Sequence, residues 1–394
     1  MLIEFHLLQN HAPSNLNRDD SGSPKDCIFG AVRRARISSQ CLKRSIRLSP
    51  LFAQEMEGID LGLRTRMLPQ KVKEILIAHG IEEGLAKAAA AKATGFGNKD
   101  GKEQKNGRTA QMMFLSRQDI ETVAELLYTR ANTAASAEEL AKLNAKDLQS
   151  EAILKGWRPI TPDIALFGRM ITSEAFKDVE AAVQVAHAIS THRMDHEFDY
   201  FTAVDDLLGE GEDEDETGAG MIGDVEFNSA CYYKYFSLDY EAFVRNLAGP
   251  APEEKAGKQE KAAYEDSLAE AKTVAARTVP AFLRAAVFTT PSGKQNTFAA
   301  HQLPDAVLVE VRPYQTPVSY ANAFVKPAQA RGNVDLVEDS LHKLAEHVEL
   351  LNRKFSLQAE PRLWFCTREV AVAGTSACET LDDLLAALSQ ALAR

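Results

Sequence analysis

The sequence predicts an α+β protein. Three observations support this class. Strand-like apolar segments lie in both the first and the last third of the chain, the block from 61 to 160 is rich in the helix formers Ala, Leu, Glu and Lys, and a strongly acidic stretch interrupts the strand-like segments that follow. With 394 residues and about 150 residues per domain, the chain is expected to form two or three domains.

The N-terminal part is expected to contain two strands and a helix. Leu2–Gln9 is apolar and is followed by turn-forming residues, which is typical of a strand. In a second strand, Val32–Ile37, the period-2 alternation places Arg34 and Arg36 on one face. Ser38 is then the expected N-cap of a helix that runs from Ser39 to about Leu48.

The central block is expected to be helical, and the segments after it to mix strands and helices. Its Ala- and Leu-rich runs predict helices over Pro69–Ala93, Ala110–Ala131 and Ser136–Leu154. A strand at Pro162–Phe167 and a helix at Val179–Thr191 are expected to follow.

The C-terminal part is expected to contain a long hairpin and further elements. Residues 195–233 carry thirteen acidic side chains and no Lys or Arg, so the centre of this stretch should stay solvated between a strand at Tyr200–Thr202 and one at Glu226–Tyr235. The remaining predictions are helices at Ala262–Thr278 and Leu336–Phe355 and strands at Thr297–Ala300 and Ala306–Arg312.

Basic residues are concentrated near the N-terminus. The formal net charge of −11 argues against a uniformly nucleic-acid-binding surface, but Asn17–Ser49 contains eight basic residues and three acidic ones. Within the expected helix, a polar stripe at i, i+3, i+4 and i+7 lies away from Leu42 and Ile46, which are free to pack inward. The stripe consists of Gln40, Lys43, Arg44 and Arg47.

Two interpretations of this basic segment are open. A basic helix face is most often just solvated surface. Here the adjoining arginine strand and a polar loop with Arg18 and Lys25 favour binding of a polyanion, because ammonium, guanidinium and amide groups follow a phosphate backbone without selecting bases.

The same segment carries a family resemblance. The motifs Ser14-Asn-Leu-Asn-Arg-Asp-Asp, Lys25-Asp-Cys-Ile-Phe-Gly and Arg33-Arg-Ala-Arg-Ile-Ser-Ser-Gln-Cys-Leu-Lys-Arg closely resemble the N-terminus of the CasC (Cse family) proteins. These are backbone subunits of the type I-E CRISPR complex Cascade. The resemblance to this family continues along the chain at four further segments. They are Gly168-Arg-Met-Ile-Thr, Ala186-His-Ala-Ile-Ser-Thr-His, Tyr200-Phe-Thr-Ala-Val-Asp-Asp-Leu and Pro317-Val-Ser-Tyr-Ala-Asn-Ala-Phe.

The resemblance implies a palm with an RNA-recognition-motif-like (ferredoxin-like) sheet, a helical fingers insertion and a projecting thumb hairpin. The palm would comprise residues 1–60, 161–191 and 229–394, the fingers 61–160 and the thumb 192–228. Copies of the chain would line up along a CRISPR RNA, kink it at intervals and present its bases for pairing with target DNA, beside other Cascade subunits.

The resemblance also assigns roles to residues. Most of the expected RNA-backbone contacts follow from the motif positions, and Arg34 and Arg44 are added from the basic cluster itself. The expected set is Arg18, Lys25, Arg34, Ser38, Gln40, Lys43, Arg44 and Arg47. Met170 would wedge near the kink, where Tyr200, Phe201 and Thr202 of a neighbour's thumb would lie.

No catalytic residue, metal or cofactor is expected. The five cysteines are scattered without a CxxC pair, which fits a reducing compartment, and no signal peptide or membrane-spanning run is visible, so we expect a cytoplasmic protein without membrane contact. His192 and His196 are expected to cap or pack rather than to bind a metal. The G-x-G-x-x-G match at Gly218–Gly223 lacks the strand-turn-helix context of a dinucleotide site and is expected to supply turn glycines.

Two alternative functions are open. Asp19, Asp20 and Asp26 lie inside the basic segment and would suit a metal-dependent endoribonuclease, as in related effectors that cut RNA with a loop aspartate. A protein-only scaffold would explain the acidic surface but not the basic stripe. Phosphate binding weakens steeply with salt and nuclease activity requires the metal, so salt and chelator distinguish the three functions.

Overall fold

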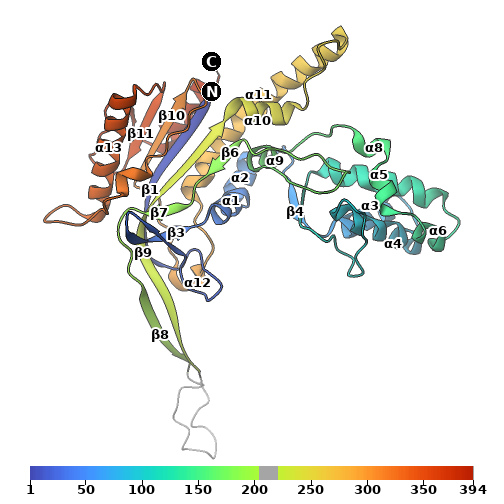
Figure 1. The fold of residues 1–394 in the computed structure, drawn as a ribbon, viewed down its shortest axis with the longest axis horizontal. Helices are drawn as coiled ribbons and strands as arrows, with labels where there is room; N and C mark the ends of the chain where they lie inside the picture. The colour runs from blue at the N-terminus through green and yellow to red at the C-terminus, as the bar shows by residue number, and fades with distance from the viewer. Residues whose placement is uncertain (204–220, 394) are drawn as a thin grey trace, which may run out of the picture. The chain divides into compact units, whose positions relative to one another are not determined.

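The computed structural model describes residues 1–203 and 221–393 and divides into two compact units (Figure 1). Unit 1 comprises Met1–Phe52, Val185–Ser237 and Pro280–Arg394. Unit 2 comprises Ala53–Gln184 and Leu238–Val279. Both units mix helices with strands, and the large sheet lies in unit 1, which confirms the α+β class.

Unit 1 is built on a sheet with the strand order β12-β11-β10-β1-β9-β7-β3-β2. The strands are β1 (Leu2–Ser14), β2 (Asp26–Phe29), β3 (Val32–Ile37), β7 (Ala188–Ser190), β9 (Met221–Asp239), β10 (Ala306–Arg312), β11 (Arg362–Cys366) and β12 (Ser376–Cys378). Strand β1 pairs with β10 antiparallel from Leu2 opposite Arg312 to Leu8 opposite Ala306. Since both strands are buried along these residues, the centre of the sheet is covered on both faces.

Helices cover this sheet. They are α1 (Ser39–Arg47), α12 (Gln295–Phe298), the short 3-10 turn η2 (Ala321–Phe324), α13 (Leu336–Phe355) and α14 (Leu381–Leu392). The N-cap of helix α13 is Asp335, whose side chain accepts a hydrogen bond from the Glu338 N–H. Its apolar stripe of Leu341, Leu344 and Val348 packs on the sheet, and this packing forms one of the hydrophobic cores of unit 1.

A two-stranded ribbon extends unit 1. Strand β8 (Glu197–Ala203) pairs antiparallel with the first part of β9, from Glu197 opposite Phe227 to Ala203 opposite Met221 (Figure 1). Every residue of β8 is exposed. The structure therefore shows the expected hairpin strands; the segment 204–220 between them lies outside the described residues, and the predictions for the acidic tip and for Gly218 and Gly220 lie there.

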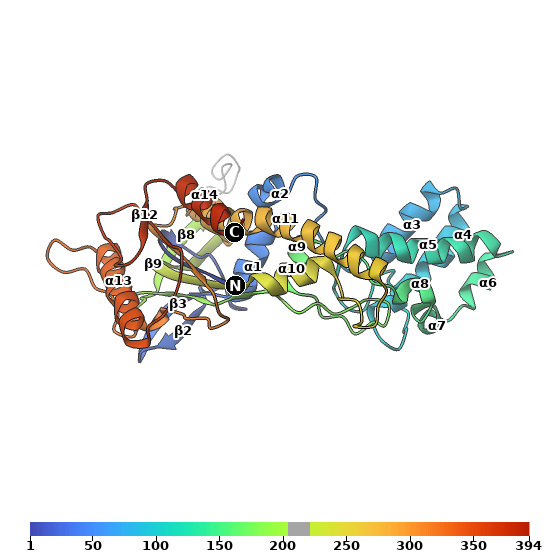
Figure 2. The same cartoon turned by 90° about the horizontal axis from the view of Figure 1, so that it is seen from above.

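Unit 2 is mainly helical. Its elements are β4 (Leu63–Thr65), α3 (Leu68–Ala78), α4 (Glu83–Lys92), η1 (Ala93–Gly97), β5 (Met113–Leu115), α5 (Arg117–Thr133), α6 (Ala137–Ala141), α7 (Ala145–Gln149), α8 (Ala152–Lys155), α9 (Pro162–Phe167) and α10 (Tyr240–Ala248). Helices α3, α4 and α5 pack together, as Figure 2 shows. Their shared core includes Val72, Leu76, Val123 and Leu127. Buried Asp119 caps the start of α5 and binds Arg158 and Arg169 at 2.8 and 2.6 Å.

Three more elements lie at or across the unit boundaries. They are α2 (Pro50–Glu55), β6 (Val183–Val185) and α11 (Lys258–Phe288). Within unit 2, the Arg277 side chain of α11 donates to the carbonyl oxygens of Glu55 and Glu57 at 2.7 and 2.9 Å. No described helix is both long and apolar enough to span a bilayer.

Several predicted elements are confirmed and three are wrong. The predicted bounds match β3, β10 and α13, and α1 ends one residue earlier than expected. The expected strand Pro162–Phe167 is helix α9, because Pro162 is in the first helical turn, where its missing N–H costs nothing. The expected helix Val179–Thr191 contains the strands β6 and β7, and the first half of the expected strand Thr297–Ala300 lies in α12.

The predicted helices of unit 2 are shorter than expected. Pro69–Ala93 is divided between α3 and α4 at Gly80, which has a φ of +86° and ends the first helix. Ala110–Ala131 begins with strand β5 before α5, and Ser136–Leu154 contains three short helices. The division into palm, fingers and thumb stays a prediction, since compactness alone does not define those parts.

Candidate nucleic-acid interface

Helix α1 forms as the sequence predicts. The Ser38 side chain accepts a hydrogen bond from the Cys41 N–H at 3.3 Å and so caps the first turn. Leu42 and Ile46 are buried. The helix therefore packs through its aliphatic residues and presents its polar residues on the opposite side.

Two cations on the polar side of α1, Lys43 and Arg44, form no ion pair among the described residues. Gln40 and Arg44 are exposed, and Lys43 and Arg47 are half-buried. Among the described residues, no ion pair includes Lys43 or Arg44. Burial lowers the pKa of the Lys43 ammonium, which shows that its stem packs on the protein. A ligand anion near Lys43 and Arg44 would be attracted by cations that form no ion pair among the described residues.

A second cluster of positive charge lies beside α1. The Lys25 carbonyl accepts from the Arg36 N–H at 2.9 Å, and the Arg36 Nη1 lies 3.2 Å from the His187 Nδ1. Partial burial, followed by the charges of Arg36 and Lys25, lowers the pKa of His187. The contacts of Arg36 with His187 and with the Lys25 main chain bring these basic groups together, so an anion bound there would be stabilised.

Sequence reasoning did not select Arg36 or His187. Arg36 was part of the basic cluster, but the strand pattern did not predict that His187, the residue directly before β7, would lie next to it. The signal that points to this contact is the pairing of β3 with β7, in which Arg36 is opposite Ile189. That pairing joins segments about 150 residues apart, which periodicity does not detect.

Arg34 supports the fold. It is 0% exposed, and its guanidinium donates to the carbonyl oxygens of Phe29, Ser190, Phe324 and Val325 at 2.7–3.3 Å. A side chain with this burial and these partners is not available to a ligand in this conformation. The expected RNA contact of Arg34 is therefore not supported, and we assign the residue to the core of unit 1.

Arg18 and Arg44 come together at a pocket of about 770 Å³. The pocket is lined by the loop from Leu16 to Gly22, one face of α1 and the segment from Thr289 to Gly293. Gly293 lies so close to this loop that a Cβ would be 2.4 Å from the Leu16 carbonyl oxygen. The structure thus places Arg44 on the edge between the pocket and the polar side of α1.

Two of the three loop aspartates, Asp19 and Asp26, have structural roles. The Asp19 carboxylate accepts from the Ser21 and Ser23 N–H groups and the Ser21 hydroxyl at 2.7–3.0 Å, and these hydrogen bonds, led by the hydroxyl, lower its pKa. Asp26 pairs with Arg33 and with His196. Asp19, Asp20 and Asp26 do not form a metal-ligand cluster among the described residues.

The two histidines at 192 and 196 are satisfied by protein groups. His192 Nδ1 lies 2.7 Å from the Arg193 carbonyl, and its Nε2 accepts from the Cys231 N–H at 3.3 Å. His196 lies between the carboxylates of Asp26 and Glu226. His192 therefore packs against main-chain groups as expected, whereas His196 bridges two carboxylates, which the sequence did not predict.

The β8–β9 ribbon exposes large apolar side chains. Tyr200 is 64% exposed and Phe201 38%, and Thr202 is also exposed. Phe201 lies opposite Gly223, where a Cβ would be 2.6 Å from its ring. Gly223 therefore serves cross-strand packing. The ribbon also exposes Phe198, Met221 and Ile222.

Met170 belongs to unit 2. It is 89% exposed and directly follows Arg169, whose guanidinium is buried against Asp119. Gly168, with a φ of +77°, has no room for a Cβ beside Ala181. Buried, hydrogen-bonded neighbours therefore hold the exposed Met170 side chain in place, although a single exposed apolar residue does not by itself indicate a binding site.

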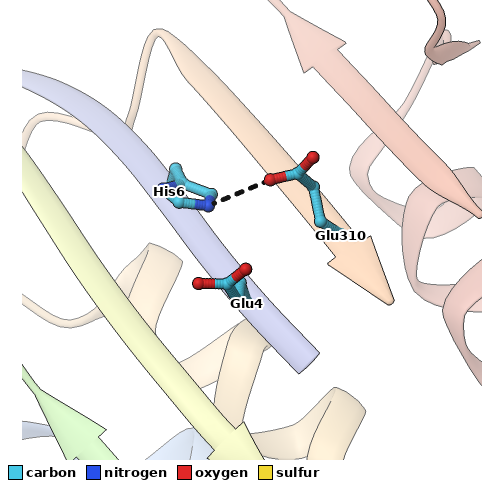
Figure 3. Close-up of side chains that lie close together, drawn as sticks. All are labelled: Glu4, His6 and Glu310. Carbon is cyan, nitrogen blue, oxygen red and sulfur yellow. Dashed lines mark ion pairs between the residues drawn. The ribbon is translucent and has the colours of Figure 1, made fainter. Parts of the chain in front are cut away.

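A cluster of potential metal ligands lies elsewhere, in the core of unit 1. Figure 3 shows Glu4 and His6 on β1 and Glu310 on β10, each completely buried. Arg312 bridges the two carboxylates, and Arg362 Nε donates to Glu310 at 2.7 Å. The hydroxyls of Tyr235 and Tyr320 donate to Glu4 and Glu310. Protein donors already occupy the carboxylate oxygens, so these residues do not fit a metal ion and instead form a closed network of paired charges.

Comparison with known proteins places this geometry in a family. A family model described as CT1975-like protein matches residues 3–390. A solved structure titled "CRISPR RNA-guided surveillance complex, pre-nicking" contains a chain that is 27% identical, with 100% of both chains covered and a TM-score of 0.80. A chain from a second structure, titled "CRISPR RNA-guided surveillance complex", has the same fold at 22% identity, with 100% of this chain and 99% of that chain covered and a TM-score of 0.69.

A search of curated proteins found no match. The family model and the 27%-identical chain confirm the resemblance to Cascade backbone subunits that the sequence motifs indicate. The family model covers almost the whole chain, including both units. The chain therefore belongs to the CT1975-like protein family.

Proposed function

We propose that this protein is a CRISPR RNA-binding backbone subunit of a type I-E Cascade complex. The single observation that carries the proposal is the polar side of α1, where Lys43 and Arg44 have no acidic partner among the described residues, next to the Lys25–Arg36–His187 cluster. Unneutralised cations on a rigid helix suit a phosphate backbone, which fixes position without selecting sequence. The likeness to chains of RNA-guided surveillance complexes supports the same ligand.

In this proposal the chain is not an enzyme. It polymerises with copies of itself along the guide RNA, beside other Cascade subunits, in the cytoplasm. A palm with an RNA-recognition-motif-like sheet holds the RNA, and base pairing between the guide and target DNA supplies the sequence specificity. The engagement of Asp19 and Asp26 in turns and ion pairs gives the nuclease alternative no support.

The exposed apolar residues have a matching role in the proposal. Met170 and a neighbouring copy's Tyr200, Phe201 and Thr202 would lie at a kinked nucleotide. An aromatic face there would replace the base stacking that the kink removes, worth about 1–3 kcal/mol per base.

The first experiment is sedimentation of the purified protein with CRISPR RNAs of different lengths, at low and high salt, with and without chelator. We expect assemblies that grow with RNA length, weaken with salt and leave the RNA intact. Shortening of the RNA that chelator prevents would overturn the proposal in favour of the nuclease, and no RNA-dependent change would favour a protein-only scaffold.

The second experiment tests the polar side of α1. The double variant Gln40→Ala/Lys43→Glu should bind RNA at least about tenfold more weakly, whatever the RNA sequence, with a shallower salt dependence. The matched control is Gln358→Ala/Lys354→Glu, which makes the same chemical change at two exposed positions, one in the last turn of α13 and one just after the helix. Equal losses in the two variants would remove α1 from the interface.

A further inference from the structure

Two asparagines join the segments that carry the proposed RNA contacts. The loop from Asn17 to Lys25 is a tight hairpin in which the Lys25 N–H donates to the Asn17 carbonyl at 2.8 Å and the Asp19 N–H donates to Ser23 at 2.9 Å. Arg18 and Lys25 therefore have a fixed spacing at the base of this loop. These hydrogen bonds lie within the loop and do not determine its position relative to α1.

Asn17 sets that position. Its Oδ1 accepts a hydrogen bond from the Ser38 N–H at 2.9 Å, at the N-cap of α1. The main chain of one residue thus closes the loop, while its side chain fastens the loop to the start of the helix. The cations on the loop and those on α1 are held in one arrangement by this acceptor.

Asn15 extends the connection to the β8–β9 ribbon. It is 0% exposed, and its Nδ2 donates to the carbonyl oxygens of Gly22 and Glu226, both at 2.9 Å. Glu226 lies opposite Phe198 in the ribbon and pairs with His196 through its carboxylate. One buried amide therefore ties the far side of the loop to the base of the ribbon.

We propose that Asn17 is a positioning residue for RNA binding and that Asn15 couples the same loop to the ribbon. The inference rests on the proposed function. Asn17 aligns Arg18 and Lys25 with the polar side of α1, so that they contact successive phosphates together. Without the Asn17 Oδ1 acceptor, the loop and α1 each keep their charges but are no longer held in a fixed relative position. Fewer phosphates are then neutralised at once.

The two residues act through opposite ends of the amide, which gives a sharp test. Asn17 uses its oxygen as an acceptor, and an Asp side chain preserves that oxygen. Asn15 uses its NH₂ as a donor, and an Asp side chain lacks it. Asn17→Asp and Asn15→Asp add the same charge, yet only the second removes the hydrogen bonds that the structure shows.

The experiment measures the RNA affinity, its salt dependence and amide hydrogen exchange at Ser38. Asn17→Ala should weaken RNA binding about tenfold and reduce the salt slope by about 0.7, the equivalent of one phosphate contact on a single strand. Exchange at the Ser38 amide should accelerate. Asn17→Asp should keep the slow exchange and most of the salt slope that Asn17→Ala loses. Asn15→Asp should bind RNA more weakly than the wild type.

Each outcome has one meaning. A merely structural role for Asn17 would lower the melting temperature of Asn17→Ala while the folded protein kept the wild-type salt slope, which would overturn the inference. Wild-type exchange at Ser38 in Asn17→Ala would also overturn it, even if that variant bound RNA poorly. If the wild-type protein itself bound no RNA, the proposed function would fail, while the exchange measurement would still report the hydrogen bond.

Discussion

Unit 1 contains two groups of charges that differ in how they are neutralised. In the closed network of Glu4, Glu310, Arg312 and Arg362, each carboxylate is buried against a guanidinium. On the polar side of α1, the half-buried Lys43 and the exposed Arg44 form no ion pair with a carboxylate among the described residues. Fully paired buried charge fixes the structure, and unpaired surface charge remains available for a ligand. Changes in the first group should therefore affect stability, and changes in the second should affect binding.

Breaking the closed network should have the largest effect. Arg312→Met removes the cation between two buried carboxylates, and we expect the free energy of unfolding to fall by about 3–5 kcal/mol. Urea denaturation measures the change. The control is Asp382→Asn, which breaks an exposed pair with Arg284 and should cost at most about 1 kcal/mol. Similar losses in both variants would contradict the distinction between buried and exposed pairs.

A buried amine sharpens the comparison through pH. Lys234 is 1% exposed, donates to the Gln9 side chain and has its pKa lowered by burial from 10.5 to about 8. Between these values the unfolded chain binds the proton that the folded chain has lost, so stability rises with pH. From pH 8 to 10 the unfolding free energy of the wild type, relative to that of Lys234→Met, should increase by about 2 kcal/mol. A constant difference would show that Lys234 stays charged when buried.

The last comparison concerns two arginines on the same strand, and the smallest effect on stability is expected from Arg36→Met. Arg34→Met leaves four carbonyl oxygens without their donor and should destabilise the protein by about 1–3 kcal/mol. Arg36→Met should leave stability within about 1 kcal/mol of the wild type and weaken RNA binding several-fold, because one phosphate contact is lost. Parallel thermal melts and RNA titrations of the two variants measure both properties, and a reversed pattern would exchange their roles.

The sequence was sufficient where the information is local. A capping serine, two inward aliphatic residues and a polar stripe predict α1, and the bounds of α13 follow from its apolar period. The exposed position of Tyr200 follows from the acidic, strand-like stretch around it.

Long-range contacts set the limit of prediction. Arg34 and Arg36 share a face by alternation, but only Arg34 is covered, by a carbonyl-bearing segment about 290 residues away in the chain. For the same reason, the sequence pattern did not predict the contact of His187 with Arg36 or the network around Glu4. Asn17 was visible as a turn residue, yet its side-chain contact with Ser38 spans a hairpin and a strand.

The segment from Val318 to Val325 is held on the sheet by hydrogen bonds to side chains of three different strands, β1, β10 and β3. The Val318 N–H donates to Glu4, the Tyr320 hydroxyl donates to Glu310, and Arg34 holds the end of the segment. This has an evolutionary consequence. A change of Glu4 removes the acceptor of the Val318 N–H and of the Arg312 Nε, so we expect it to be tolerated only when these partners change too. Among relatives, these positions should therefore vary as a block, while Lys43 and Arg44 should vary independently of them.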